Sequence, residues 1–375
     1  MAEKAFKQLK QGDFMLVLLV LALSLFGVAM VFSASYYNAL SKFGNPYKFL
    51  TEAAVWVLIG WVAFAFFSFV DYHYLKLLSW PLMAVGLILL FLIFTPLGLT
   101  LNNATRWLDF KYFTVMPGEV IKFCLILFVA TFLSEDPTRA QRFLPGVFPM
   151  LVLAGICFAA IYKQPNLSTA GLVLLLVLGM LFVAGLPGLW VMITAASGAV
   201  IAVLAVVAPG GEYRLQRVRG FLNPFLDPLG SGYQAAQSLL ALGSGGVFGA
   251  GPGRSIQKTL YLPEPQNDFI LAIIGEEIGF VGVLLLLCVY VALIWRCCHI
   301  AVRAKDFFGM MLASGITIIL SVQVLMNIAV VTASFPPTGV TLPFISLGGN
   351  AMVIFLSMMG IMTNIAGQAS PARAL

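Results

Sequence analysis

The sequence predicts an all-α polytopic membrane protein, a bundle of about ten transmembrane helices with one large external loop. Two observations lead to this prediction. The mean hydropathy is +1.00 and only 10% of the 375 residues are charged, whereas soluble domains carry roughly 25% charged residues. Apolar runs of about 18 or more residues recur along the chain, and each could cross a bilayer as a helix. The alternating ten-residue pattern of a membrane barrel is absent.

The individual spans follow from these runs. Backbone groups in lipid need internal partners, so the spans should be helices packed as one integral membrane domain over residues 1–375. The first run is longer than the core of a signal peptide, so we expect it to be retained, with cleavage after the small residues of FSAS as the alternative. The predicted spans are 14–35, 49–70, 77–98, 117–134, 144–162, 168–185, 188–208, 269–295, 309–332 and 345–366.

Basic residues in short loops predict the orientation, because they are enriched on the cytoplasmic side. An even number of spans places both termini on one side. That side carries Lys4, Lys7, Lys10, Lys76, Arg139, Arg142, Arg296, Arg303, Lys305 and Arg373. The opposite side carries only Lys42, Lys48, Arg106, Lys111 and Lys163 in its short loops. Both termini are therefore expected in the cytoplasm, with loop 209–268 outside. The basic residues of that long loop indicate an anionic ligand.

Two pairs of polar residues lie within the predicted spans, where an unpartnered charge costs at least a few kcal/mol. Glu119 and Lys122 are three residues apart on one helical face, so they could pair with each other or line a polar cavity. Gln323 and Asn327 are four apart and suit hydrogen bonds between helices.

The stretch LPEPQNDFILAIIGEEIGFVG, from Leu262 to Gly282, carries three carboxylates into a span. Asp268 could be the N-cap of that helix, with Glu276 and Glu277 as buried hydrogen-bonding anchors. Alternatively, Asp268 is a carboxylate at the membrane face, beside the basic loop, where a lipid head group would sit. Small residues on the same helical face would allow close helix packing.

Two further segments combine glycine and proline. GSGGVFGAGPGR, from Gly243 to Arg254, lacks the GK[ST] ending of a phosphate-binding loop and follows no strand, so we expect an irregular, close-packed loop. FPPTGVTLPFISLGGN, from Phe335 to Asn350, precedes the last span. Irregular backbone at membrane depth is tolerated inside protein or beside a cavity, so this segment is expected to be a re-entrant turn lining a site.

Two histidines without ligand spacing predict no zinc site.

Taken together, the motifs resemble the SEDS proteins, the FtsW, RodA and SpoVE group of bacteria. The segment NNATRWLDFKYFTVMPGEVIKF is similar to that family's N-G-x-x-R-W…Q-P-S-E-x-x-K pattern, and QPNLSTA to Q-P-D-L-G-T. The loop YRLQRVRGFLNPFLDPLGSGYQAAQSLLALGSGGVFGAGPG and the two stretches quoted above, LPEPQNDFILAIIGEEIGFVG and PPTGVTLPFISLGGN, match the family's remaining patterns in order. Five ordered motifs on about ten spans make the resemblance specific.

The sequence departs from the family pattern at several positions, which affects the detail of the site rather than the reaction. Asn166 stands where the family usually has Asp, and Ser168 where it has Gly. Asn267, Leu347 and Asn350 replace the common Thr, Tyr and Ser. The carboxylate that the family pattern treats as catalytic is retained as Asp268.

The resemblance implies a peptidoglycan glycosyltransferase that polymerises lipid II in division, elongation or sporulation. It implies that Asp268 is the base for the attacking hydroxyl and that arginines stabilise the leaving undecaprenyl pyrophosphate. No cofactor or dedicated metal site is evident, although a divalent cation could share that task. The expected substrate-binding residues are Arg106, Lys111, Glu119, Lys122, Arg214, Arg217, Arg219, Glu276 and Ser346.

The same resemblance implies the partners and the location. The expected partners are lipid II, the undecaprenyl-pyrophosphate-linked glycan, membrane lipid and a class B penicillin-binding protein, with no nucleic acid. The location is the bacterial cytoplasmic membrane. A lipid II flippase is the alternative function, because polar residues within the spans would suit a lipid pathway. The concentration of motifs on one face argues against it, and we find no inverted repeat. A membrane scaffold is the third alternative.

Overall fold

The computed structural model describes residues 13–101, 104–111, 113–164, 166–190, 192–194, 196, 198, 220–227, 230 and 232–369. Each predicted span except 188–208, which lies largely outside these residues, corresponds to a helix. Eight helices in the described part are long and apolar enough to cross a membrane, and α7 is a shorter apolar helix. The helices of the bundle are α2 (Phe14–Phe43), α3 (Lys48–Phe69), α4 (His73–Leu92), α5 (Pro117–Glu135), α6 (Phe148–Lys163), α7 (Leu167–Val183), α11 (Ile270–Val302), α12 (Phe307–Val331) and α13 (Gly349–Gln368).

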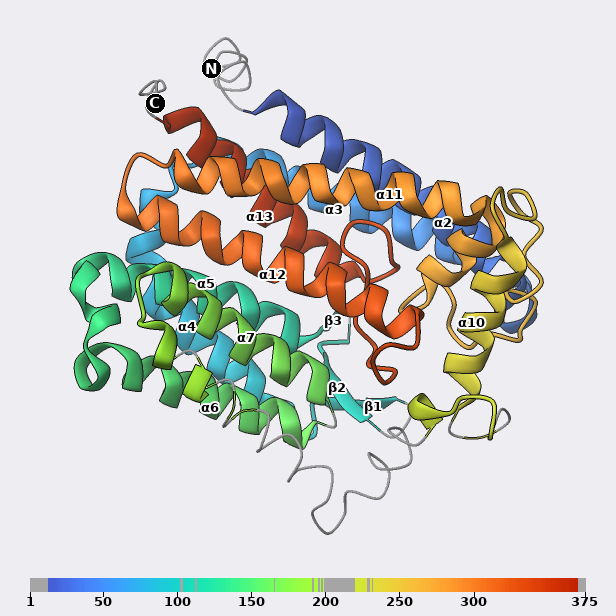
Figure 1. Ribbon diagram of the computed structural model, residues 1–375, viewed down its shortest axis with the longest axis horizontal. Helices are drawn as coiled ribbons and strands as arrows, with labels where there is room; N and C mark the ends of the chain where they lie inside the picture. The colour runs from blue at the N-terminus through green and yellow to red at the C-terminus, as the bar shows by residue number, and fades with distance from the viewer. Residues whose placement is uncertain are drawn as a thin grey trace.

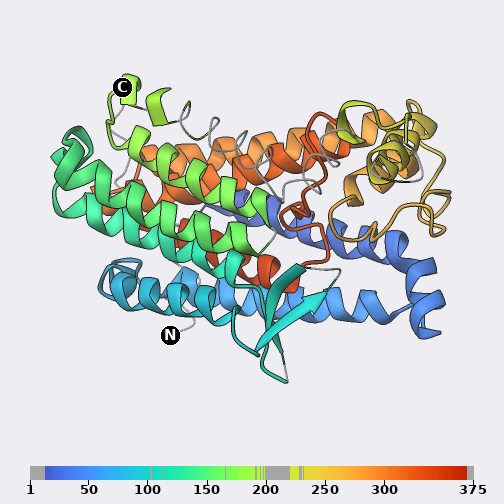
Figure 2. The ribbon, with the colours of Figure 1, turned by 90° about the horizontal axis from the view of Figure 1, so that it is seen from below.

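The helices of the bundle run between two ends (Figures 1 and 2), and polar contacts identify the helix ends that lie together at one of them. At one end, Asp13 before α2 pairs with Arg296 near the end of α11. At the same end, Asn364 near the end of α13 donates to the Ser68 carbonyl of α3. The first and last described helices therefore begin and end on one side, as the predicted even number of spans requires. The opposite end carries α10 (Tyr233–Gly245), and we call it the α10 end.

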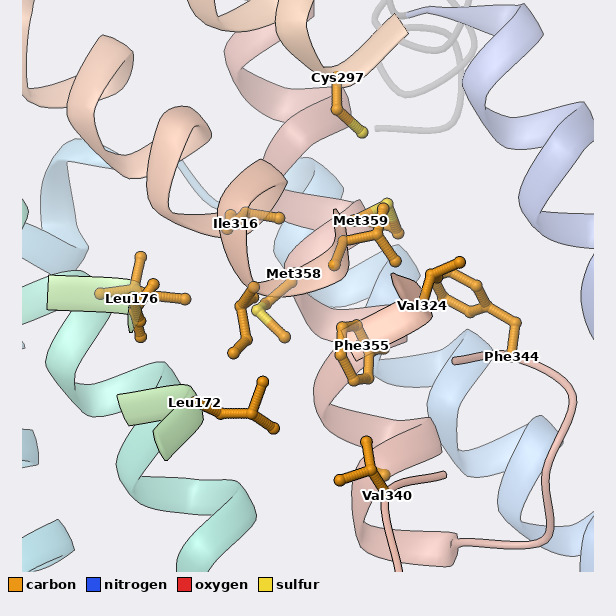
Figure 3. Close-up of a cluster of buried hydrophobic side chains, with 14 of the residues drawn as sticks. Leu172, Leu176, Cys297, Ile316, Val324, Val340, Phe344, Phe355, Met358 and Met359 are labelled. Carbon is orange, nitrogen blue, oxygen red and sulfur yellow. The ribbon is translucent and has the colours of Figure 1, made fainter. Parts of the chain in front are cut away.

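The core of the bundle is apolar and is centred on α5, α12 and α13, whose side chains are mostly buried. The segment between α12 and α13 contributes to the same core. Figure 3 shows its Val340 and Phe344 beside Phe355 of α13, and the rings of Phe344 and Phe355 meet edge-on with centroids 5.8 Å apart. By contrast, only 22% of the most apolar 18-residue stretch is buried in α3 and in α11, as expected for helix surfaces that face lipid.

A three-stranded antiparallel sheet lies at the α10 end, between α4 and α5. Its strands are β1 (Gly98–Leu101), β2 (Ala104–Asp109) and β3 (Thr114–Val115), in the order β1-β2-β3. The predicted span 77–98 is followed by a predicted loop, so the sheet is not anticipated by the sequence pattern. The strands are only four, six and two residues long, and alternation over so few residues beside a long apolar run gives a weak signal.

Helix α11 is broken at Gly279, which has φ +75° and ψ −174°. The break opens a gap in the helical hydrogen bonding, and the loop after α10 fills it. Two amides of that loop, Ala250 N and Gly251 N, donate to the carbonyls of Glu276 and Glu277 at 2.9 and 3.0 Å. In return, the amides of residues 280 and 281 donate to the carbonyls of residues 246 and 247. The glycine-rich segment is thus a close-packed loop, as predicted, inserted into the backbone of a membrane helix.

Glycines make this insertion sterically feasible. A Cβ on Gly279 would lie 2.2 Å from Gly249 N, and a Cβ on Gly245 would lie 2.0 Å from the Gly275 carbonyl oxygen. The predicted small-residue face of α11 therefore does allow close packing, against α10 and its loop. These small residues do not all lie on one regular helix, because the positive φ of Gly279 interrupts α11 there.

Candidate active site

Three segments that are far apart in the sequence converge on Gly339 at the α10 end. Gly339 lies between α12 and α13 and has φ +76°. A Cβ built on it would lie 3.4 Å from Nη1 of Arg106, on β2, and 3.6 Å from Oδ2 of Asp268, just before α11. The guanidinium and the carboxylate therefore face the same backbone position, and both side chains are partly exposed. An acid and a fixed cation beside an open backbone can bind and activate a polar, anionic substrate.

Asp268 does not cap α11. The helix begins at Ile270, its N-cap is Phe269, and the cap makes no side-chain hydrogen bond. The N-cap interpretation of Asp268 is therefore wrong, because the helix begins one residue later than a cap at Asp268 requires. The backbone of Asp268 is held instead by Asn327 of α12, whose Nδ2 donates to the Asp268 carbonyl at 2.9 Å.

A buried polar chain runs from α5 to the segment that carries Gly339. Lys122 Nζ lies 2.8 Å from Oε2 of Glu119 and donates to Oε1 of Gln323 at 2.8 Å. Gln323 Nε2 donates onward to the Thr341 carbonyl at 3.1 Å. The side chains of Lys122 and Glu119 are 2% and 9% exposed, so the pair is buried inside the bundle. Of the two alternatives from the sequence, direct pairing of Glu119 with Lys122 is the one observed.

Glu276 anchors the loop that leads to Asp268. Its carboxylate accepts hydrogen bonds from the Ser255 hydroxyl and from the amides of Ile256 and Gln257, at 2.9 and 3.2 Å for the two amides. The residue is 2% exposed. Three donors from one loop stabilise a buried carboxylate, so the position of Glu276 supports the anchoring role that the sequence left open.

Glu277 forms a second buried anchor. Its Oε1 lies 2.7 Å from Nζ of Lys258, and the side chains are 1% and 3% exposed. Ser33 of α2 donates to the same carboxylate at 2.7 Å. This cluster ties α2, α11 and the loop after α10 together, and it accounts for one of the basic residues that the sequence analysis assigned to an anionic ligand.

The segment from Phe335 to Asn350 is a turn held from several sides. Phe344 adopts φ +67°, which is unusual for a bulky residue, and the neighbouring Pro343 carbonyl accepts a 2.5 Å hydrogen bond from the buried Tyr290 hydroxyl. Ser346 is buried, and its Oγ accepts from the amide of Leu342 at 2.8 Å. The predicted irregular turn is confirmed by this geometry, with Ser346 in its interior, and the substrate-binding role expected of Ser346 stays a prediction.

A sequence model of the cell cycle protein family that comprises FtsW, RodA and SpoVE matches residues 13–370. The chain belongs to this family. It is 36% identical over 357 residues to the probable peptidoglycan glycosyltransferase FtsW of Geobacter sp. (strain M18), covering 94% of this chain and 96% of that protein. It is 40% identical to stage V sporulation protein E of Bacillus subtilis (strain 168), with the same coverage.

Solved structures with the same fold are also found. One is a chain of a structure described as "Structural coordination of polymerization and crosslinking by a peptidoglycan synthase complex", with 27% identity, a TM-score of 0.77, and coverage of 95% of this chain and 97% of that one. Another is the rod shape determining protein RodA of Thermus thermophilus, with 25% identity, a TM-score of 0.69, and coverage of 96% and 98%.

The remaining predicted site residues of this family member are placed as follows. Lys111 is exposed beside the sheet, with φ +70° and its amide bonded to Oδ1 of Asp109 at 2.8 Å. The cluster Arg214, Arg217 and Arg219 lies outside the described residues, so its role stays a prediction. Within the part of the chain that the structure describes, no group of three or more His, Cys, Asp or Glu could hold a metal ion.

Sequence reasoning missed two residues of the site. Gly339 was quoted only as part of a turn motif, although its positive φ and its two neighbours make it the meeting point of the site. Asn327 was assigned to packing between helices, whereas it donates to the backbone of two site segments. The departure at Asn166 is explained, because its Oδ1 caps α7 by accepting from the Thr169 amide at 3.3 Å, which an asparagine does as well as an aspartate.

Proposed function

We propose that this chain is a peptidoglycan glycosyltransferase that polymerises lipid II into glycan strands. The observation that supports this most directly is the convergence of Asp268 and Arg106 on Gly339. Relatives that cover almost the whole chain carry the name peptidoglycan glycosyltransferase, and a structure with the same fold is described as a peptidoglycan synthase complex.

The proposed reaction uses the two charged groups differently. The 4-hydroxyl of the incoming sugar attacks the anomeric carbon of the growing strand, and the bond from that carbon to the pyrophosphate oxygen breaks. Asp268 accepts the hydroxyl proton, a role that its partly exposed carboxylate can fill. Arg106 is positioned to bind phosphate oxygens through its planar guanidinium, which would stabilise the negative charge that develops on the leaving group.

The surroundings hold these groups in place. The loop before Asp268 is fixed to α11 by the Glu276 carboxylate, and the turn that carries Gly339 is fixed to α12 by Gln323. A reacting pair that is held rigidly before the substrate arrives avoids reorganisation during the reaction. We propose that Glu119 and Lys122 act through Gln323 on this turn, in addition to any contact with the substrate.

A lipid II flippase is the second candidate, because polar groups inside the bundle could line a lipid pathway. The buried Glu119–Lys122 pair is closed off from the surface, which favours polymerisation in the state described. The deciding experiment uses purified protein in liposomes with fluorescent lipid II. Polymerisation predicts long glycan strands, whereas a pure flippase would move the label between leaflets without forming any strand.

We further propose a multi-pass arrangement in the cytoplasmic membrane with both termini in the cytoplasm and the α10 end outside. The distribution of basic residues supports this orientation. The proposed partner is a class B penicillin-binding protein, which fits a fold shared with a complex that combines polymerisation and crosslinking. Co-purification with the penicillin-binding proteins of the same cell tests it.

A further inference from the structure

The amide of Asn327 joins the two segments that bring Asp268 and Gly339 together. Its Nδ2 donates to the Asp268 carbonyl at 2.9 Å and to the Val340 carbonyl at 2.8 Å. One of these carbonyls belongs to the residue with the reactive carboxylate, and the other to the residue after Gly339. We infer that Asn327 is a positioning residue that sets the placement of Asp268 relative to Gly339 for the reaction, an inference that rests on the proposed function.

The orientation of this amide is fixed by its partners. Both hydrogens of Nδ2 are used, and the Oδ1 atom has no hydrogen-bond partner among the described residues. A flipped amide would point its oxygen at two carbonyl oxygens, which repel it. Asn327 is fully buried. A buried acceptor without a partner destabilises the folded state. The two hydrogen bonds that Nδ2 donates offset this destabilisation.

The two segments have other attachments, so the contribution of Asn327 is local. The amide of Leu347 donates to the Gln266 carbonyl at 2.9 Å, which joins the same turn to the same loop. Gln323 holds the turn at Thr341. Loss of Asn327 therefore leaves both segments attached near their ends and loosens them at Asp268 and Val340, the positions that flank the reaction.

The chain offers a matched control in Asn364. This residue is 3% exposed, its Nδ2 donates to the Ser68 carbonyl at 2.9 Å, and its Oδ1 accepts from the Tyr72 amide at 3.0 Å. It ties α13 to the connection between α3 and α4 through these two hydrogen bonds, at the end of the bundle remote from Asp268. Loss of a buried amide in general is expected to affect both asparagines equally, whereas a positioning role is specific to Asn327.

The test compares Asn327→Ala and Asn364→Ala in the full-length protein, purified in lipid nanodiscs and restricted to the folded, monodisperse fraction. With labelled lipid II as the probe, we expect Asn327→Ala to lower kcat about 10- to 100-fold, since a misplacement of about 1 Å can cost that much. KM should change less than kcat, because groups that bind the lipid and its phosphates remain. Asn364→Ala should retain wild-type kcat.

Hydrogen–deuterium exchange provides a readout that does not depend on activity. Asn327→Ala should speed exchange in the peptides around Asp268 and Val340, and Asn364→Ala should not. Unchanged exchange in Asn327→Ala, or equal losses of kcat in the two alanine variants, would overturn the positioning role. An inactive wild-type protein would instead refute the proposed glycosyltransferase function, and the exchange data would still decide whether Asn327 positions the two segments.

The pH dependence of the activity of Asn327→Asp tests the hydrogen-bonding role of this residue. A protonated aspartate can donate one hydrogen bond to one of the two carbonyls, whereas an ionised one can donate none. Its activity, divided by that of the wild type at each pH, should therefore rise as the pH is lowered. The ratio for Asn327→Ala should stay flat. A flat ratio for the aspartate variant would contradict the hydrogen-bonding role.

Discussion

Arg106 and Asp268 meet over a residue without a side chain. The guanidinium Nη1 and the carboxylate Oδ2 lie 3.4 and 3.6 Å from the position that a Cβ on Gly339 would occupy. The two side chains come from β2 and from the loop before α11, and nothing in their own segments requires them to approach each other. A side chain at Gly339 would therefore begin in contact with both the cation and the acid.

Gly339→Ala should therefore lower activity more than it lowers stability. The left-handed backbone costs about 1–2 kcal/mol for an alanine, and the new methyl group would lie against both Arg106 and Asp268. We expect a loss of lipid II polymerisation of about 10-fold or more, given the sensitivity of reaction rates to small displacements.

Gly44→Ala is the matched control for that variant. Gly44 ends α2 with φ +65°, and no atom lies within 4 Å of the position that a Cβ on it would occupy, so it carries the same backbone strain without a site beside it. It should lose a similar amount of thermal stability and keep its activity. Equal activity of Gly339→Ala and Gly44→Ala would show that the absence of a side chain at Gly339 has no role in the reaction.

The buried pair of Lys258 and Glu277 gives a prediction on stability. Removal of one member leaves an uncompensated buried charge, which costs about 3–5 kcal/mol. Lys258→Met and Glu277→Gln should each lower the unfolding temperature in detergent, and the double variant should be more stable than the sum of the two losses predicts. Strictly additive losses in this double-mutant cycle would show that the pair is not coupled.

The break in α11 predicts a severe effect at Gly279. A Cβ there would meet the backbone of Gly249 at 2.2 Å, so Gly279→Ala should displace the inserted loop and reduce the yield of folded protein. Gly171→Ala in α7 should be tolerated, because nothing lies within 4 Å of its Cβ position and alanine favours a helix by up to about 1 kcal/mol over glycine. Measurement of folded, monodisperse protein by size-exclusion chromatography separates the two, and normal yield of Gly279→Ala would contradict the insertion.

Membrane orientation is open to direct labelling. Leu226, near the start of α10, is 83% exposed, and the native Cys298 is exposed near the opposite end of the bundle. An impermeant maleimide should label Leu226→Cys in intact cells and reach Cys298 only after the membrane is opened. The reverse pattern would place the α10 end, and the substrate with it, in the cytoplasm.

The apolar runs were enough to predict the helices, because the length and hydrophobicity of a span are local properties of the sequence. The break at Gly279 was not predictable in this way. The flanking residues read as one continuous helix, and the partners that satisfy the broken hydrogen bonds come from the loop after α10. The sheet was not predictable for a different reason, because its strands are too short to give a clear period.

The site residues show the same contrast between what the local sequence determines and what distant segments determine. Asp268 and Arg106 were identified through motifs, and the structure brings both to Gly339. The sequence could not decide between the alternatives for Glu276, because the donors that occupy its carboxylate lie about 20 residues earlier in a loop of irregular shape. Asn327 was assigned to helix packing for a similar reason, since its two carbonyl partners belong to other segments.

The most direct test of the central claim is the rate of lipid II polymerisation by Asp268→Asn. The structure makes this variant a clean one, because Asp268 caps no helix and its backbone carbonyl, which Asn327 binds, is unchanged. Glu264→Gln, on the same loop and paired with Lys42 at the surface, serves as the control. We predict that Asp268→Asn folds normally and loses at least about 10²- to 10⁴-fold in rate, the range typical for loss of a general base, while Glu264→Gln retains wild-type activity. Polymerisation by Asp268→Asn at the wild-type rate would contradict the account.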